Sequence, residues 1–215
     1  MFKRKSNKIL LGILTSLIIV LGALEVKSYL DTRNRQQPEK VTTKQIGPYT
    51  VNATQTEYQK DVEVSLLAAL EANNGDDIMS EVSKYFISDY FTLKDKTNFN
   101  NVGGLGFIFP DTKARFKVNA IDSYYRDLST YIKAYGNNNL PLVTKITVGK
   151  PASINTDLID AGKDVEVKKA YDVSVVWEYQ ENDVLDNLDV VTQATLRFAA
   201  GSDDVWYIYE IVGQE

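Results

Sequence analysis

The feature that most constrains the fold of this chain is a change in hydrophobic period near residue 140. Before this point, apolar residues recur three and four positions apart, which predicts helices. After Pro141 they alternate every second position, which predicts strands over residues 142–150, 165–180, 189–199 and 205–212. Helices followed by consecutive antiparallel strands are typical of α+β domains, so we expect this fold class.

Three helices are expected ahead of the strands. The first begins after Thr54 and stops at Asn73-Asn74-Gly75, and the second follows directly. The third and longest covers residues 111–135, since Pro110 precedes it and Gly136 follows it. We expect the four strands to form a curved antiparallel sheet around this long helix.

The N-terminal region predicts a membrane segment. Residues 9–24 are uncharged and mostly apolar, and residues 3–8 contain four Lys and Arg residues. A bilayer-spanning helix needs roughly 20 residues, and this run reaches that length only with its flanks, so a cleaved signal peptide is the alternative. No Ala-x-Ala cleavage site follows the run, and this favours an anchor. We therefore expect a cytoplasmic tail over residues 1–8, a single-pass transmembrane signal anchor in the cell membrane over residues 9–27, a linker over residues 28–53, and an extracytoplasmic domain over residues 54–215.

Composition excludes several classes of function. The chain of 215 residues contains neither Cys nor His, which removes thiolate nucleophiles, Ser-His-Asp triads and the usual zinc sites. The net charge is −5 although residues 1–8 are basic, so the rest of the chain is strongly acidic. Because an acidic domain repels phosphate groups, we expect no direct binding of nucleic acid.

A glycine-rich stretch, Gly103-Gly104-x-Gly106, is the first candidate binding motif. Glycines let backbone N–H groups approach an anion closely, so the stretch could hold a phosphate. It lacks the spacing of the dinucleotide-binding motif and the Lys of a phosphate-binding loop, so a structural turn is the better interpretation. We expect no cofactor.

Acidic residues between the strands are the second candidate. Asp183, Asp186 and Asp189 lie three positions apart, and Asp203-Asp204 follows. The spacing does not match a calcium-binding loop, so solvated turns are the better interpretation, and we expect no metal site. Distant carboxylates could still meet for acid–base chemistry, but nothing in the spacing points to a pair, and we expect a protein without catalytic activity.

Aromatic residues make up 11% of the chain, and most lie on the apolar stripes of expected helices and strands. Tyr124 and Tyr131 lie off the stripe of the third helix, and Trp206 lies on the last strand. Because Tyr and Trp are frequent at protein interfaces, these three residues are candidates for an interaction surface, with core packing as the alternative.

The order of these parts resembles the NTF2-like domains of assembly subunits in type IV secretion and conjugation machines, including those of Gram-positive bacteria. The resemblance is one of architecture and extends over residues 1–215. It implies a membrane-anchored, non-enzymatic scaffold that binds other membrane and secretion proteins through its extracytoplasmic domain and forms homo-oligomers.

The main alternative is a cell-envelope accessory protein that holds a small ligand in the cone between the sheet and the long helix. A scaffold predicts that side chains fill this cone, whereas a ligand-binding protein predicts that it is open. Fold alone cannot decide between these functions, because NTF2-like folds also host enzymes and ligand-binding proteins.

Overall fold

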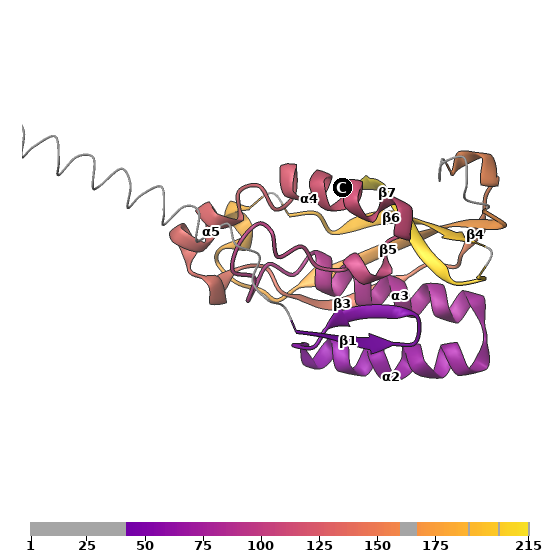
Figure 1. Cartoon of the computed structure of the whole chain (residues 1–215). Coiled ribbons are helices and arrows are strands. Elements are labelled where there is room, and N and C mark those ends of the chain that lie inside the picture. The colour runs from indigo at the N-terminus through magenta and orange to yellow at the C-terminus, as the bar shows by residue number, and fades with distance from the viewer. Residues whose placement is uncertain (1–41, 160–166, 189, 202, 215) are drawn as a thin grey trace, which may run out of the picture. The chain divides into compact units, whose positions relative to one another are not determined.

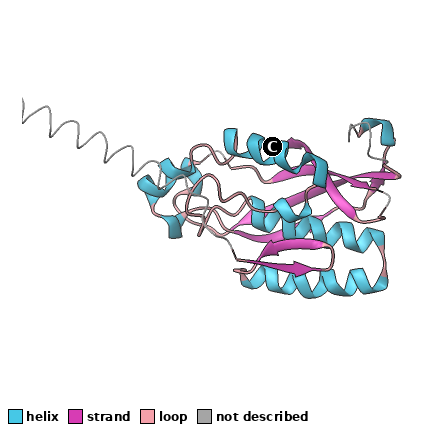
Figure 2. Cartoon of the chain, in the orientation of Figure 1, coloured by secondary structure: helices cyan, strands magenta, loops and turns pink. Residues whose placement is uncertain are grey.

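Four α-helices and two antiparallel β-sheets make up the part of the chain that the computed structural model describes, which is residues 42–159, 167–188, 190–201 and 203–214 (Figure 1). The chain is therefore mixed α+β (Figure 2). The helices are α2 (Glu57–Ala72), α3 (Gly75–Tyr90), α4 (Lys113–Asp122) and α5 (Leu128–Tyr135). The described residues also form five short 3₁₀ turns, which are η1 (Leu105–Phe107), η2 (Pro110–Thr112), η3 (Asn137–Asn139), η4 (Thr156–Leu158) and η5 (Leu185–Asn187).

Helices α2 and α3 form an antiparallel hairpin whose ends are capped by side chains (Figure 1). The Thr56 hydroxyl accepts the Gln59 N–H, and the Gln59 side chain accepts the Thr56 N–H, so two donors of the first turn are satisfied. Asn73 has the left-handed conformation that ends α2, and the Asn74 side chain caps α3. The predicted helix stop at this point is confirmed.

The third predicted helix, residues 111–135, is broken in the structure into η2, α4 and α5. The backbone leaves the helical region at Ser123, with φ −120° and ψ −97°. This break turns Tyr125 into the core, where its hydroxyl donates to the Tyr90 carbonyl at 2.6 Å and accepts the Gly103 N–H at 3.1 Å. The stability gained by burying this ring with two hydrogen bonds outweighs that of an uninterrupted helix, which the apolar spacing predicted.

The large sheet has five strands, so the prediction of a four-stranded sheet is wrong. Its order is β3-β5-β6-β7, all antiparallel, and the additional strand β4 also pairs with β5. Gly149 and Pro151 interrupt β3, and the chain then pairs again with β5, which is long enough for both partners. The strands are β3 (Val143–Val148), β4 (Ala152–Ser153), β5 (Lys169–Tyr179), β6 (Gln193–Ala200) and β7 (Trp206–Gln214).

A separate β-hairpin, β1 (Thr43–Ile46) and β2 (Tyr49–Asn52), lies within the stretch predicted as a linker over residues 28–53. Its Ile46, Tyr49 and Val51 side chains are buried in the main core. The Tyr49 hydroxyl donates to the Trp206 carbonyl at 2.8 Å, so the hairpin is bonded to the start of the last strand. The folded domain therefore begins earlier than residue 54.

A further correction concerns the predicted membrane anchor. In the residues that the structure describes, no helix is long and apolar enough to cross a membrane. The predicted anchor, residues 9–27, lies outside the described residues. The prediction of a single-pass membrane protein therefore gains no support from the structure.

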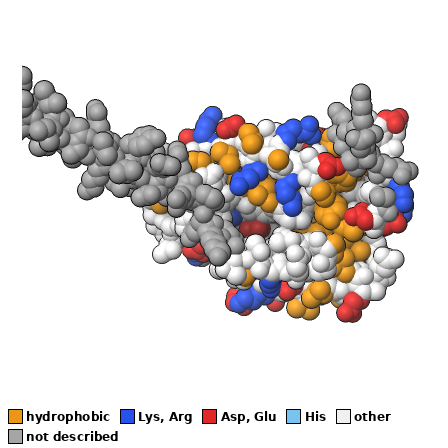
Figure 3. All heavy atoms as spheres, in the orientation of Figure 1, with side chains coloured by type: hydrophobic (Ala, Val, Ile, Leu, Met, Phe, Trp, Pro, Cys, Tyr) orange, Lys and Arg blue, Asp and Glu red, His pale blue; other side chains and the backbone are white. Residues whose placement is uncertain are grey.

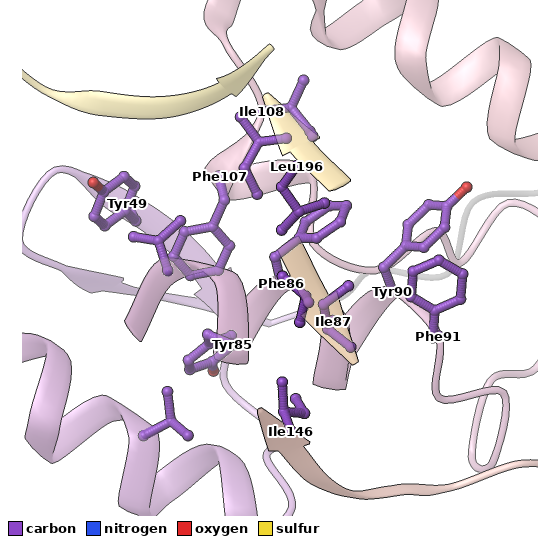
Figure 4. Close-up of a cluster of buried hydrophobic side chains, with 14 of the residues drawn as sticks. Tyr49, Tyr85, Phe86, Ile87, Tyr90, Phe91, Phe107, Ile108, Ile146 and Leu196 are labelled. Carbon is purple, nitrogen blue, oxygen red and sulfur yellow. The ribbon is translucent and has the colours of Figure 1, made fainter. Parts of the chain in front are cut away.

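Aromatic side chains fill the main core between α3 and the sheet (Figure 4). Phe91 lies 4.4 Å from Trp177 of β5, measured between ring centroids, and Phe86 stacks on Tyr90 at 5.3 Å. Phe107 packs against Tyr85 from the loop side at 5.1 Å. Each fully buried ring contributes roughly 1.5–3 kcal/mol to stability, so this cluster holds the helices on the sheet.

Replacing Gly106 with alanine should destabilise the domain, because the added Cβ would lie 1.7 Å from the Thr50 carbonyl oxygen of β2. Overpacking against a backbone atom costs about 1–3 kcal/mol, which corresponds to a fall in Tm of roughly 2–12 °C for a domain of this size. Gly149→Ala is the control, since its nearest neighbouring atom would be 3.2 Å away. Thermal unfolding followed by circular dichroism measures both, and an equal Tm for the two variants would contradict the packing described.

The β1–β2 hairpin is also bonded to α2 through Glu63. The Lys44 ammonium and the Gln55 side-chain amide donate to the same Glu63 oxygen, at 2.5 and 2.7 Å. Burial alone would raise the pKa of Glu63, but the bonds from Lys44 and Gln55 outweigh it and hold this pKa below its ordinary value of 4.5. The charged form of Glu63 therefore stabilises the folded state.

Because the folded-state pKa of Glu63 is lowered, its contribution to stability is present above about pH 4.5 and is lost as the pH falls through the folded-state value. The Glu63→Gln variant should therefore lose less of its stability between pH 7 and pH 3 than the wild-type chain, as measured by urea unfolding at several pH values. Identical pH dependence in the two proteins would show that Glu63 is not held in this network.

Candidate interaction surface on the outer face of the sheet

The two faces of the large sheet differ in what covers them. Along β5, Val173, Val175 and Trp177 point inward and are buried against the helices. Ser174 and Val176 point to the other side and are exposed, as expected from alternation along a strand. We call this second side the outer face.

One end of the outer face is covered by a small second cluster. Phe109, from the loop before α4, lies 6.1 Å from Tyr207 and 6.4 Å from Tyr209, measured between ring centroids. Ile159 and Ala199 are buried in the same cluster. This end of the face is therefore packed and not available for binding.

An ion-pair network crosses the middle of the outer face. Arg197 of β6 is the cross-strand neighbour of Asp172 on β5 and of Glu210 on β7. Its guanidinium donates two hydrogen bonds to Asp172, at 2.9 and 3.0 Å, and one to Glu210, at 2.8 Å. The hydrogen bonds to Asp172 raise the pKa of Arg197 further, so the network keeps its central positive charge at every accessible pH.

Beyond this network lies a shallow depression of about 300 Å³. It forms because Ser174 and Thr195, which are paired across β5 and β6, have short side chains, and because the chain bulges at Gly213, where φ is +69°. Val176 forms one side and is 49% exposed. We call this depression the outer groove, and it is lined by Ser174, Val175, Val176, Gln193, Ala194, Thr195, Val212 and Gly213.

The outer groove combines hydroxyl groups with apolar side chains and has no titratable residue in its lining. It can therefore form hydrogen bonds and apolar contacts with a bound molecule. Among the described residues, no group of three or more acidic side chains is placed to hold a metal ion.

The three residues predicted as an interaction surface do not come together. Trp206 is only 8% exposed and packs edge to face on Tyr171 at 5.4 Å. Tyr124 donates a hydrogen bond to the carbonyl of Phe91, just after α3, and Tyr131 is partly buried against the main core. Since Trp206 lies beside the start of α3 and α3 spans about 24 Å, Tyr124 and Trp206 cannot share one surface patch.

The glycine-rich stretch is a structural turn, as interpreted from the sequence. The Gly103 N–H donates to the Tyr125 hydroxyl at 3.1 Å, and the Gly104 N–H donates to the Asp89 carboxylate at 2.7 Å. A Cβ on Gly103 would lie 2.1 Å from the Asp89 carbonyl oxygen. The N–H groups of Gly103 and Gly104, which could have bound an anion, are thus used inside the protein.

The acidic residues considered for calcium that the structure describes lie between strands. Asp183 and Asp186 lie between β5 and β6, and Asp189 lies outside the described residues. Asp203 accepts the Val205 N–H at 3.2 Å in the turn before β7. This side-chain bond to the backbone is the usual use of Asp in a turn.

The outer groove was not predicted from the sequence. In the sequence, the groove corresponds to the short polar residues Ser174 and Thr195, which face outward on neighbouring strands. They can be recognised as neighbours only once the pairing of β5, β6 and β7 is known. Comparison of the chain with protein-family models, with curated proteins and with solved structures gave no match. The interpretation of the surface therefore depends on its geometry.

Removing the guanidinium of Arg197 should destabilise the sheet, because Asp172 and Glu210, on the strands to either side, would lose the cation between them. We expect a loss of about 1–3 kcal/mol for Arg197→Met, near the lower end because Glu210 is 43% exposed. Arg197→Lys keeps the charge but not the planar fork of donors, so its loss should be intermediate. Urea unfolding at pH 7 measures all three proteins, and equal stabilities would contradict a structural role for the network.

Proposed function

We propose that this domain is a non-enzymatic protein-binding module, a scaffold that holds other proteins of a larger assembly. The observation that carries the proposal is the contrast between the two faces of the sheet. The inner face is packed with aromatic side chains, whereas the outer groove is open to solvent on the outer face, beyond the Arg197 network. A rigid sheet with an open outer face presents a fixed surface to a partner protein.

The packing of the interior weighs against the alternative of a small-ligand-binding protein. That alternative needs an open cone between the sheet and the long helix predicted over residues 111–135. Tyr124, which belongs to that stretch, packs edge to face on Phe91 at 5.1 Å between ring centroids. In the described residues, Phe91 and Trp177 are in ring contact across this space, and Phe86 and Tyr90 stack beside them. Figure 4 shows Phe86, Tyr90 and Phe91 of this group, with Leu196 of β6 beside them.

The chemistry of the outer groove favours a protein partner. Its volume is at the lower limit of small-molecule sites, and such sites enclose most of their ligand, whereas this groove is a shallow depression on a sheet. Exposed Val176 offers apolar contact, and the hydroxyls of Ser174 and Thr195 offer hydrogen bonds. This mixture of an apolar contact with polar neighbours is typical of non-obligate protein interfaces.

The resemblance to assembly subunits supplies the class of partner. A domain with helices followed by an antiparallel sheet, and with its binding surface on that sheet, is suited to contact other subunits of a conjugative type IV secretion apparatus. This assignment rests on architecture, and fold alone does not determine function.

The test compares the proteins that co-purify with the tagged full-length chain from its host cells. Val176→Glu places a charge in the outer groove and should abolish recovery of the partners, which we expect to be subunits of one assembly identified by mass spectrometry. Val118→Glu, at a valine of α4 that is 56% exposed, is the matched control and should leave recovery unchanged. Both sites are exposed, so neither substitution should alter folding.

Two results would contradict the proposal. Recovery of the same partners with Val176→Glu would show that the outer groove is not the binding surface. Recovery of no partner with the wild-type chain, together with thermal stabilisation by a small cell-envelope molecule, would favour the ligand-binding alternative.

A further inference from the structure

The outward side of α2 carries an apolar stripe that no described element covers. Val64 is 69% exposed and Leu67 is 42% exposed. The buried residues of this helix, which include Val62 and Leu66, lie on the opposite side against α3. Two exposed aliphatic residues on one helix face indicate a surface that is suited to contact with another helix.

Charged residues extend this stripe in both directions, and they have opposite signs. Lys60 lies four positions before Val64, and Glu71 lies four positions after Leu67. The spacing of four, three and four places all four side chains on one line along the helix, as at a coiled-coil seam. Along the lower edge of Figure 3, where α2 lies, hydrophobic side chains are flanked by charged ones.

This order of residues is self-complementary in an antiparallel pair. If a second α2 lies against the first with its direction reversed, and the two-fold axis passes between residues 65 and 66, Val64 faces Leu67 of the other copy. In the same register, Lys60 of each copy faces Glu71 of the other. A two-fold axis makes every contact occur twice, so two apolar contacts and two ion pairs form together.

We propose that two copies of this chain associate through α2 in this antiparallel register. Lys60 is free to change partner, since its present bond is to Glu57 one turn away, at 2.6 Å between side chains that are 54% and 90% exposed. Such exposed pairs contribute little to stability. Glu71 has no ion-pair partner among the described residues.

The size of the surface sets the expected strength. One face of a helix of 16 residues is smaller than a standard protein interface, so the dimer should be weak and dependent on concentration. The contact uses α2, whereas the proposed partner surface is the outer face of the sheet. A failure of one proposal therefore leaves the other standing.

The test uses charge reversal in the full chain and sedimentation velocity from about 1 μM to about 1 mM, the range of weak complexes. Lys60→Glu and Glu71→Lys each place like charges opposite one another at two symmetric positions, so each should raise the dimer Kd roughly threefold to thirtyfold. An equimolar mixture of the two variants should recover association, because the glutamates at positions 60 and 71 of one chain then face lysines of the other. Val118→Glu on α4 is the control and should leave the Kd unchanged.

Weakening by each single variant together with recovery in the mixture is specific to the antiparallel register. In a parallel pair residue 60 would face residue 60 and residue 71 would face residue 71, so neither single charge reversal would weaken association. The proposal is overturned if the wild-type chain remains monomeric at about 1 mM. It is also overturned if the single variants associate as well as the wild type, or if their mixture is as weak as either variant alone. Binding of a different protein to α2 in a chain that stays monomeric would assign the stripe to that partner instead.

Discussion

The packing of α3 on all sides is the constraint on which the rest of the structure depends. This helix contacts α2 on one side and β3, β5 and β7 on the other. Among its aromatic residues, Tyr85 packs on Phe107 of the loop before α4 (Figure 4). Phe86 and Tyr90 pack on Phe116 of α4. Because most of this helix is buried, α2 and the strands β3, β5 and β7 must cover it.

Hydroxyl groups connect these aromatic rings to irregular parts of the backbone. Tyr125 bonds to the end of α3 and to the glycine-rich turn, and Tyr124 bonds to the carbonyl of Phe91. Burial raises the pKa of both tyrosines well above its usual range, so they remain neutral donors. Loop backbone groups that could not be satisfied by helix or sheet are thus paired with side chains, which is why the break between α4 and α5 is tolerated.

Once α3 is covered, two surfaces remain without a partner in the described chain. One is the outer groove on the sheet, and the other is the stripe on α2 that contains Val64 and Leu67. Their chemistry differs, because the groove is lined by short polar and aliphatic side chains whereas the stripe ends in opposite charges. The proposals above assign the groove to other proteins and the stripe to a second copy of the chain.

The sequence by itself determined the class of the fold and much of its helix and strand pattern, because the hydrophobic period depends only on neighbouring residues. The stop at Asn73 and Asn74 and the four main strands were predictable for this reason. Only the tertiary structure decided the break at Ser123, the β1–β2 hairpin and the second pairing of β5, since each depends on contacts between residues far apart in the chain. The outer groove belongs to the same group: its residues come from three strands, and only the pairing register brings them together.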